Sequence, residues 1–115
     1  MFEIYTAQYR YRNHDRFDIT VKSSYGHAKK FAPTWDMVMG IKNNTMSQEE
    51  YTKQYKQILN NLDIKWVKEY IVSVGAYGGI TLVCFCPKGS FCHRYILAEW
   101  LEQNGIGKYM GEREL

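Results

Sequence analysis

Residues 80–86 (ITLVCFC) constrain the fold more than any other stretch, because apolar side chains occupy both faces of the strand they would form. Successive side chains of a strand point to opposite faces of a sheet. A strand that is apolar on both faces is typical of a parallel sheet covered by helices. We therefore predict an α/β fold, a three-layer sandwich in which helices flank a small, mostly parallel sheet, with residues 80–86 as a central strand.

The rest of the chain supplies the other elements of this fold. Residues 2–11 and 17–22 have the alternating pattern of strands. The link between them is too short for a parallel crossover, so they either form a hairpin or do not pair with each other. A last edge strand is expected at residues 106–110, after a helix that ends near Gly105. Helices are predicted to begin after four capping residues, Thr34, Ser47, Asp63 and Ser90.

Length and composition bound the class of protein. A chain of 115 residues can bury one core, so we expect a single domain over residues 1–115. No apolar run approaches the ~20 residues of a membrane span, and the N-terminus has no signal-peptide core. Three cysteines, an odd number, argue against a closed disulfide framework. These features predict a cytoplasmic protein in a reducing compartment, without a membrane partner.

The net charge of +3 is concentrated in the first quarter of the chain. Residues 1–30 hold six basic and three acidic groups, whereas residues 31–115 hold nine of each. The basic excess is explained either by a solvated strand face or by attraction of an anion to one side of the domain. Contact with nucleic acid through Arg10, Arg12 and Arg16 is a further hypothesis.

Residues 84–94 (CFCPKGSFCHR) connect the predicted central strand to the following helix, and this is where α/β proteins bind ligands. A helix N-terminus favours an anion, and glycine lets the backbone approach it closely. We therefore predict that the protein binds a nucleotide-like or other phosphate-bearing small molecule here, without a cofactor. Tyr5 would stack on a base. The other expected ligand-binding residues are Lys88, Gly89, Ser90, His93 and Arg94.

Three alternatives stay open for the same stretch, and with them the question of whether the protein is an enzyme. Cys92 at a helix start would have a lowered pKa and could act as a catalytic nucleophile, although its neighbour His93 would diverge from it on a helix. Zinc could be held by four residues of the right type, Cys84, Cys86, Cys92 and His93, in a spacing that is not a common zinc-finger spacing. Without any ligand, Cys84 and Cys86 would be core residues and Arg94 a surface cation.

The stretch LVCFCPKGSFCHRYILAEWLEQNG resembles the C-terminal signature of domain-of-unknown-function family 488, and IYTAQYRY, KKFAPTWDMVMG and EEYTKQY resemble its other blocks. The resemblance implies a small bacterial, archaeal or phage α/β protein, located in the cytoplasm of a bacterium, an archaeon or an infected host cell. A phage member could sequester a signalling nucleotide of its host. Many members have an acidic residue where this chain has Cys86. The motif positions carried over are Pro33, Thr34, Cys84, Cys92, His93 and Arg94.

Overall fold

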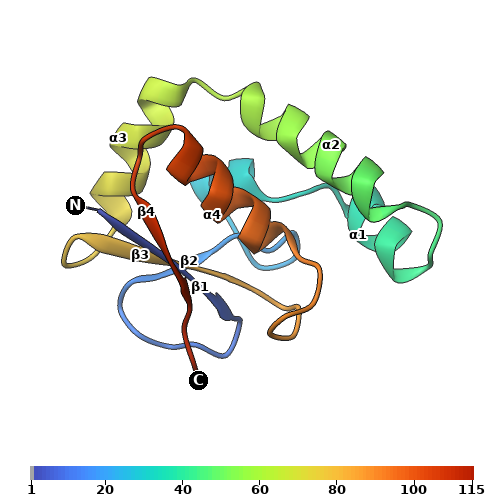
Figure 1. Cartoon of the computed structure of the whole chain (residues 1–115), viewed down its shortest axis with the longest axis horizontal. Coiled ribbons are helices and arrows are strands. Elements are labelled where there is room, and N and C mark those ends of the chain that lie inside the picture. Colours follow the sequence, from blue (N-terminus) through green and yellow to red (C-terminus); the bar gives the residue numbers. More distant parts are fainter. Residues whose placement is uncertain (1) are drawn as a thin grey trace.

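A computed structural model describes residues 2–115 as one α/β domain (Figure 1). Four strands and five helical segments follow one another along the chain: β1 (Glu3–Gln8), β2 (Arg16–Asp18), the 3-10 helix η1 (Gly26–Phe31), α1 (Trp35–Lys42), α2 (Gln48–Asn60), α3 (Ile64–Val74), β3 (Gly79–Cys84), α4 (His93–Gln103) and β4 (Lys108–Glu112).

The strands form one sheet in the order β2-β3-β1-β4, and all three neighbouring pairs are parallel. This confirms the α/β class and the parallel sheet. β1 and β2 are not paired with each other, because β3 lies between them. β3 is a central strand as expected, and each of its six residues is buried.

The helix starts follow local capping signals in three of four cases. The side chains of Thr34, Ser47 and Asp63 accept hydrogen bonds from backbone N–H groups in the first turns of α1, α2 and α3. Ser90 was expected to cap α4 and does not, because its hydroxyl donates to the Pro87 carbonyl within the preceding turn. Cys92 occupies the N-cap position of α4 instead, with extended backbone angles.

The helices lie on one side of the sheet, as Figure 1 shows for α1 to α4. The main core joins residues from every helical segment to the sheet face that carries Ile4, Ile80 and Leu82. A helix layer on both faces was expected, but among the described residues a smaller cluster of Ala7, Tyr11 and Val83 covers the opposite face. The segment after β1 folds back over that face, so loop residues make the layer that a second set of helices would have made.

The loop-covered face is held by a buried carboxylate. Asp15 accepts hydrogen bonds from the hydroxyls of Tyr11 and Thr81, at 2.7 and 2.6 Å, and pairs with Arg113. Burial raises the pKa of Asp15, but these hydrogen bonds and the Arg113 charge outweigh it and hold that pKa below the usual value. The sheet is therefore closed on this side by polar contacts as well as apolar ones.

Across residues 2–115, the helices are all too short or too polar to cross a membrane.

Candidate functional site

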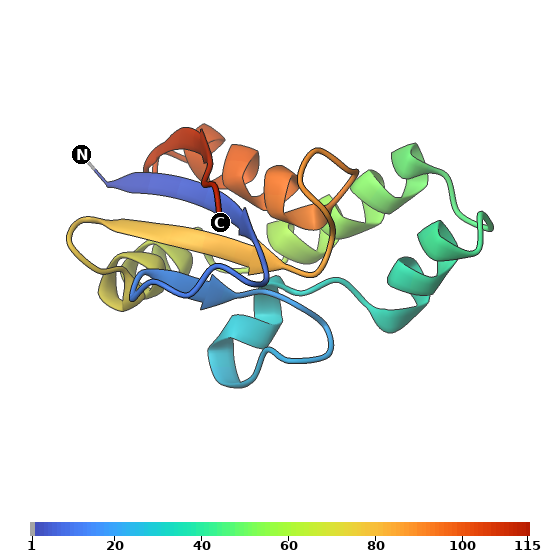
Figure 2. The ribbon, with the colours of Figure 1, turned by 90° about the horizontal axis from the view of Figure 1, so that it is seen from below.

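The candidate site lies beyond the carboxyl ends of the strands. β1, β2 and β3 point toward the same end of the molecule, and Gln8 at the end of β1 pairs in register with Cys84 at the end of β3 (Figure 2). Residues 85–92 then lead into α4, and α1 stands beyond the strand ends. The strand-to-helix connection is therefore at the ligand-binding edge of a parallel sheet, as predicted.

Arg94 organises this connection from inside the protein. Its side chain is fully buried, so the interpretation of Arg94 as a surface cation is wrong. One terminal nitrogen, Nη1, donates to the Cys84 sulfur and the Cys86 carbonyl at 3.0 and 2.9 Å. The other, Nη2, donates to the Pro87 carbonyl at 3.4 Å and to the Tyr95 hydroxyl at 2.9 Å.

Glu112 on β4 neutralises the Arg94 charge. It accepts two bonds from the guanidinium, at 3.3 Å from Nε and 2.8 Å from Nη2. Burial raises the pKa of Glu112, but the hydrogen bonds from Arg94 and Thr6 outweigh this and hold the pKa below its usual value. Every nitrogen of the guanidinium thus has an acceptor within the protein, and Arg94 positions the loop instead of facing a ligand.

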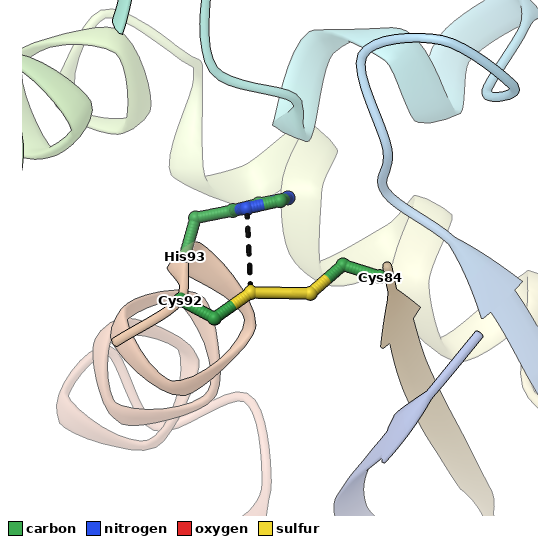
Figure 3. Close-up of side chains that lie close together, drawn as sticks. All are labelled: Cys84, Cys92 and His93. Carbon is green, nitrogen blue, oxygen red and sulfur yellow. Dashed lines mark hydrogen bonds between the residues drawn. A yellow bond between two sulfur atoms is a disulfide. The ribbon is translucent and has the colours of Figure 1, made fainter. Parts of the chain in front are cut away.

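Cys84, Cys92 and His93 meet in the interior, next to Arg94 (Figure 3). The structure joins the sulfur atoms of Cys84 and Cys92 as a disulfide, which differs from the expectation that an odd number of cysteines argues against disulfides (Figure 3). The ligand atoms of the three residues lie within 4.8 Å of one another, and all three side chains are buried. Cys86 is a separate, half-buried free cysteine, and burial raises the pKa of its thiol.

His93 lies against Cys92, although adjacent side chains on a helix were expected to diverge. Cys92 is in extended conformation before the first turn of α4, so its side chain can turn toward the His93 ring, and Nδ1 lies 3.7 Å from the Cys92 sulfur. The other ring nitrogen, Nε2, lies 2.7 Å from the Ile19 carbonyl. A carbonyl only accepts, so Nε2 carries the hydrogen, and the lone pair of the neutral ring is on Nδ1. Burial lowers the pKa of His93 to about 4, which keeps the ring neutral at physiological pH.

A pocket of about 560 Å³ opens beside this cluster, and we call it the cysteine pocket. Its walls come from the segment after β2, from α1 and α2, and from the β3–α4 connection. Most of its lining is apolar or aromatic, including Trp35, Tyr51 and Phe91. Lys22 and Lys42 are its charged residues, and among the described residues that line it none is acidic.

The predicted ligand-binding residues are divided between different surfaces. His93 lines the cysteine pocket, whereas Lys88, Gly89 and Ser90 line a separate, more open depression together with Glu112. The Lys88 ammonium is paired with Glu114. Gly89 has a positive φ of 82°, which a turn requires and glycine supplies without strain.

Tyr5 and the basic residues of the N-terminal strands lie elsewhere. Tyr5 follows the core residue Ile4 along β1, so its side chain is on the loop-covered face of the sheet. There the Arg113 guanidinium stacks over the Tyr5 ring, with Cζ 3.6 Å from the ring centroid. Arg16 donates to the Tyr9 and Tyr11 carbonyls and is used within the fold. The sequence therefore located the connection correctly but did not show which of its residues face a common cavity.

Sequence reasoning missed Lys22, Trp35 and Lys42 as residues of one pocket, and Glu112 as the partner of Arg94. Nothing in the linear pattern brings these distant positions together. Trp35, at the first position of α1, is 55% exposed, a property that the structure shows and the sequence does not.

Comparison with known proteins agrees with the architecture and the motif. The chain has no significant match among curated proteins or solved structures. Residues 1–105, which include β1, the three cysteines and all of α4, match the family model DUF488-N3a, described as the active DUF488-N3 subclade. The strand that ends in Cys84, the buried Cys92-His93-Arg94 sequence at the start of α4 and this nearly full-length match together show that the chain belongs to the DUF488 family.

Proposed function

We propose that the protein binds a nucleotide-like anionic small molecule in the cysteine pocket. The observation that carries the proposal is the pocket lining, which combines aromatic walls with two lysines and, among the described residues, no carboxylate. Small-molecule sites are typically concave and mostly apolar, with a few polar groups that fix the orientation of the ligand. The proposal keeps the sequence-based prediction that an anion binds at this edge of the sheet. The proposed binding position is the cysteine pocket and not the neighbouring Lys88–Ser90 turn.

The aromatic lining suits the flat part of such a ligand. Trp35 stands at the first position of α1 with more than half of its surface exposed, and Phe91 and Tyr51 are in edge-to-face contact at 5.1 Å. Aromatic side chains stack on bases of any sequence because each base has a π-face. A purine or pyrimidine ring would cover the exposed indole and remove apolar surface from water.

The lysines suit the anionic part. Lys22 follows β2 and Lys42 ends α1, so the two positive charges come from different elements and lie on the same pocket. Neither lysine has a carboxylate partner within ion-pair distance among the described residues, unlike Lys88 and Arg94. Lysine is an effective point charge for phosphate, and unpaired lysines in a pocket without acids favour an anionic ligand over a cationic one.

The test is binding of defined probes to the purified protein by thermal shift and calorimetry. We expect nucleoside mono-, di- or triphosphates to stabilise the protein, and nucleosides or inorganic phosphate alone to bind much more weakly, because each supplies half of the recognition. Trp35→Ala and the pair Lys22→Ala and Lys42→Ala should each weaken nucleotide binding by about tenfold or more. Lys56→Ala on the exposed side of α2 is the matched control and should bind as the wild type does. Equal affinity of wild type and all pocket variants would refute the proposal.

A second candidate is thiol chemistry at Cys92 after reduction of its disulfide with Cys84. One observation favours it, the contact between the Cys92 sulfur and the unprotonated nitrogen of His93. An enzyme would convert the bound molecule, and Cys92→Ser would stop that conversion. Mass spectrometry of the nucleotide after incubation separates the two functions, because a binding protein returns its ligand unchanged. The nucleic-acid hypothesis is tested in the same series, since binding through phosphates weakens steeply with salt and would require Arg10 and Arg12 instead of Trp35.

A further inference from the structure

We propose that Cys84, Cys92 and His93 form a binding site for one zinc-class divalent ion, with a fourth coordination position facing the cysteine pocket. This inference goes beyond the proposed nucleotide binding and does not depend on it. The three residues come from the end of β3 and the start of α4, and their ligand atoms already lie within 4.8 Å of one another. Two thiolates and one imidazole are ligands that zinc prefers, and three protein ligands leave one position for water or substrate.

The hydrogen bonding of His93 supports this assignment. Its Nε2–H donates to the Ile19 carbonyl at 2.7 Å, which fixes the ring and its tautomer, and the unprotonated Nδ1 lies 3.7 Å from the Cys92 sulfur (Figure 3). Metal-binding histidines usually donate their second ring nitrogen to a carbonyl or carboxylate in this way.

The backbone spacing of the two cysteines also suits a bridging ion. Their Cα atoms are 7.8 Å apart, whereas disulfide-linked Cα atoms usually lie about 5.5–6 Å apart. Two zinc–sulfur bonds of about 2.3 Å at a tetrahedral angle separate the sulfurs by about 3.8 Å, against about 2.0 Å in a disulfide. The two cysteines are thus spaced more widely than a disulfide usually requires, which leaves room for an ion between their sulfurs once they are reduced.

The surroundings favour thiolates at this place. Arg94 donates to the Cys84 sulfur at 3.0 Å, and a positive donor stabilises the deprotonated sulfur. A small-molecule thiol reductant first converts the Cys84–Cys92 disulfide to two thiols and is itself oxidised to a disulfide. One divalent ion then replaces the two thiol protons, which pass to solvent, so the net charge of the buried cluster does not change. Cys84, Cys92 and His93 all line the cysteine pocket, which gives an ion a path from solvent and directs the remaining position toward the proposed ligand site.

The test is metal binding by the full chain, kept reduced and first stripped with a chelator. Cobalt(II) is the probe, because thiolate ligands give it near-ultraviolet charge-transfer bands and tetrahedral sites give it intense visible bands. We expect one cobalt per chain, displaced by one zinc. Cys84→Ser, Cys92→Ser and His93→Gln should each weaken binding by more than the 10–100-fold that loss of an outer partner costs. Cys86→Ser and His14→Ala are the matched controls and should bind as the wild type does.

Circular dichroism of the metal-free variants shows whether each is folded, and a second measurement does not depend on them. In the wild type, zinc should protect Cys84 and Cys92 from iodoacetamide and leave Cys86 unprotected, with protection lost when a chelator is added. The proposal is overturned if the reduced wild type gives no charge-transfer band, or if Cys84 and Cys92 are found joined as a disulfide in protein loaded with metal. Equal loss of binding in Cys86→Ser would overturn the three-residue assignment. Nucleotide is absent throughout, so a negative result here leaves the proposed function standing.

Discussion

Replacing Arg94 tests the view that this residue holds the β3–α4 connection to the sheet. Arg94→Met keeps an unbranched side chain of similar length and removes the charge and all the donors. The guanidinium is fully buried, and the Glu112 side chain that pairs with it is 11% exposed. Removing one partner of a buried ion pair typically costs about 3–5 kcal/mol, because the remaining charge is left uncompensated. The carbonyls of Cys86 and Pro87 lose their donors in the same variant.

This loss is a large fraction of the ~5–15 kcal/mol that stabilises a domain. It is measured by urea unfolding followed by circular dichroism at pH 7. Glu112→Gln is the companion variant, and it should also destabilise the protein, because an amide oxygen still accepts from Arg94 but leaves the buried guanidinium charge uncompensated. The double variant Arg94→Met with Glu112→Leu should be more stable than Arg94→Met alone, since no buried charge is left without a partner. A loss below about 1 kcal/mol in Arg94→Met would refute the reasoning and return Arg94 to the surface.

The pH dependence gives an independent check on the same pair. The pKa of Glu112 is held below its ordinary value of 4.5 in the folded protein. The contribution of the ionised carboxylate to stability is therefore fully present above pH 4.5 and is lost as the pH falls through the lowered folded pKa. Glu112→Gln should flatten this part of the stability profile, and an unchanged profile would contradict the assignment.

Three further predictions follow from buried groups elsewhere in the fold. Leu82→Ala should lower the free energy of unfolding by about 2–5 kcal/mol in urea unfolding, because Leu82 is fully buried on a central strand. Val72→Ala is the control, at a site that is 46% exposed. A comparable loss in both variants would contradict the core assignment of Leu82. Tyr55→Phe should cost about 1–3 kcal/mol, because the buried Phe31 carbonyl loses the hydroxyl that donates to it at 2.5 Å; unchanged unfolding would show that water replaces this donor. Because the pKa of Asp15 is lowered in the folded protein, its contribution to the free energy of unfolding should be fully present above pH 3.8 and be lost as the pH falls through the folded pKa. Asp15→Asn should remove this pH dependence. An acid transition of unchanged size in that variant would mean that other carboxylates cause the transition.

Local residue patterns were enough to predict most of the helices and strands and the parallel sheet. The ITLVC part of the ITLVCFC pattern forms a strand that is buried on both faces, whereas Phe85 and Cys86, expected on the same strand, lie in the following connection. Thr34, Ser47 and Asp63 act through bonds to backbone groups two or three residues away. Such local interactions depend on neighbours in the chain, so they can be read from it directly. The location of the site was predictable for a related reason, because the carboxyl ends of parallel strands meet at one edge whatever the rest of the fold does.

Which side chains of that region meet depends on how β3, β4, α1 and α4 pack together. From the sequence, Arg94 was either a ligand-binding residue or a surface cation at the start of a helix, but in the structure it is buried and paired with Glu112, 18 residues later. Cys84 and Cys92 are separated by eight residues, and their sulfurs touch because β3 and α4 pack against each other. The cysteine pocket joins Lys22, Trp35 and Lys42 to this cluster through the packing of α1 beyond the strand ends. Contacts of this kind depend on the relative placement of whole elements, which local residue patterns do not encode.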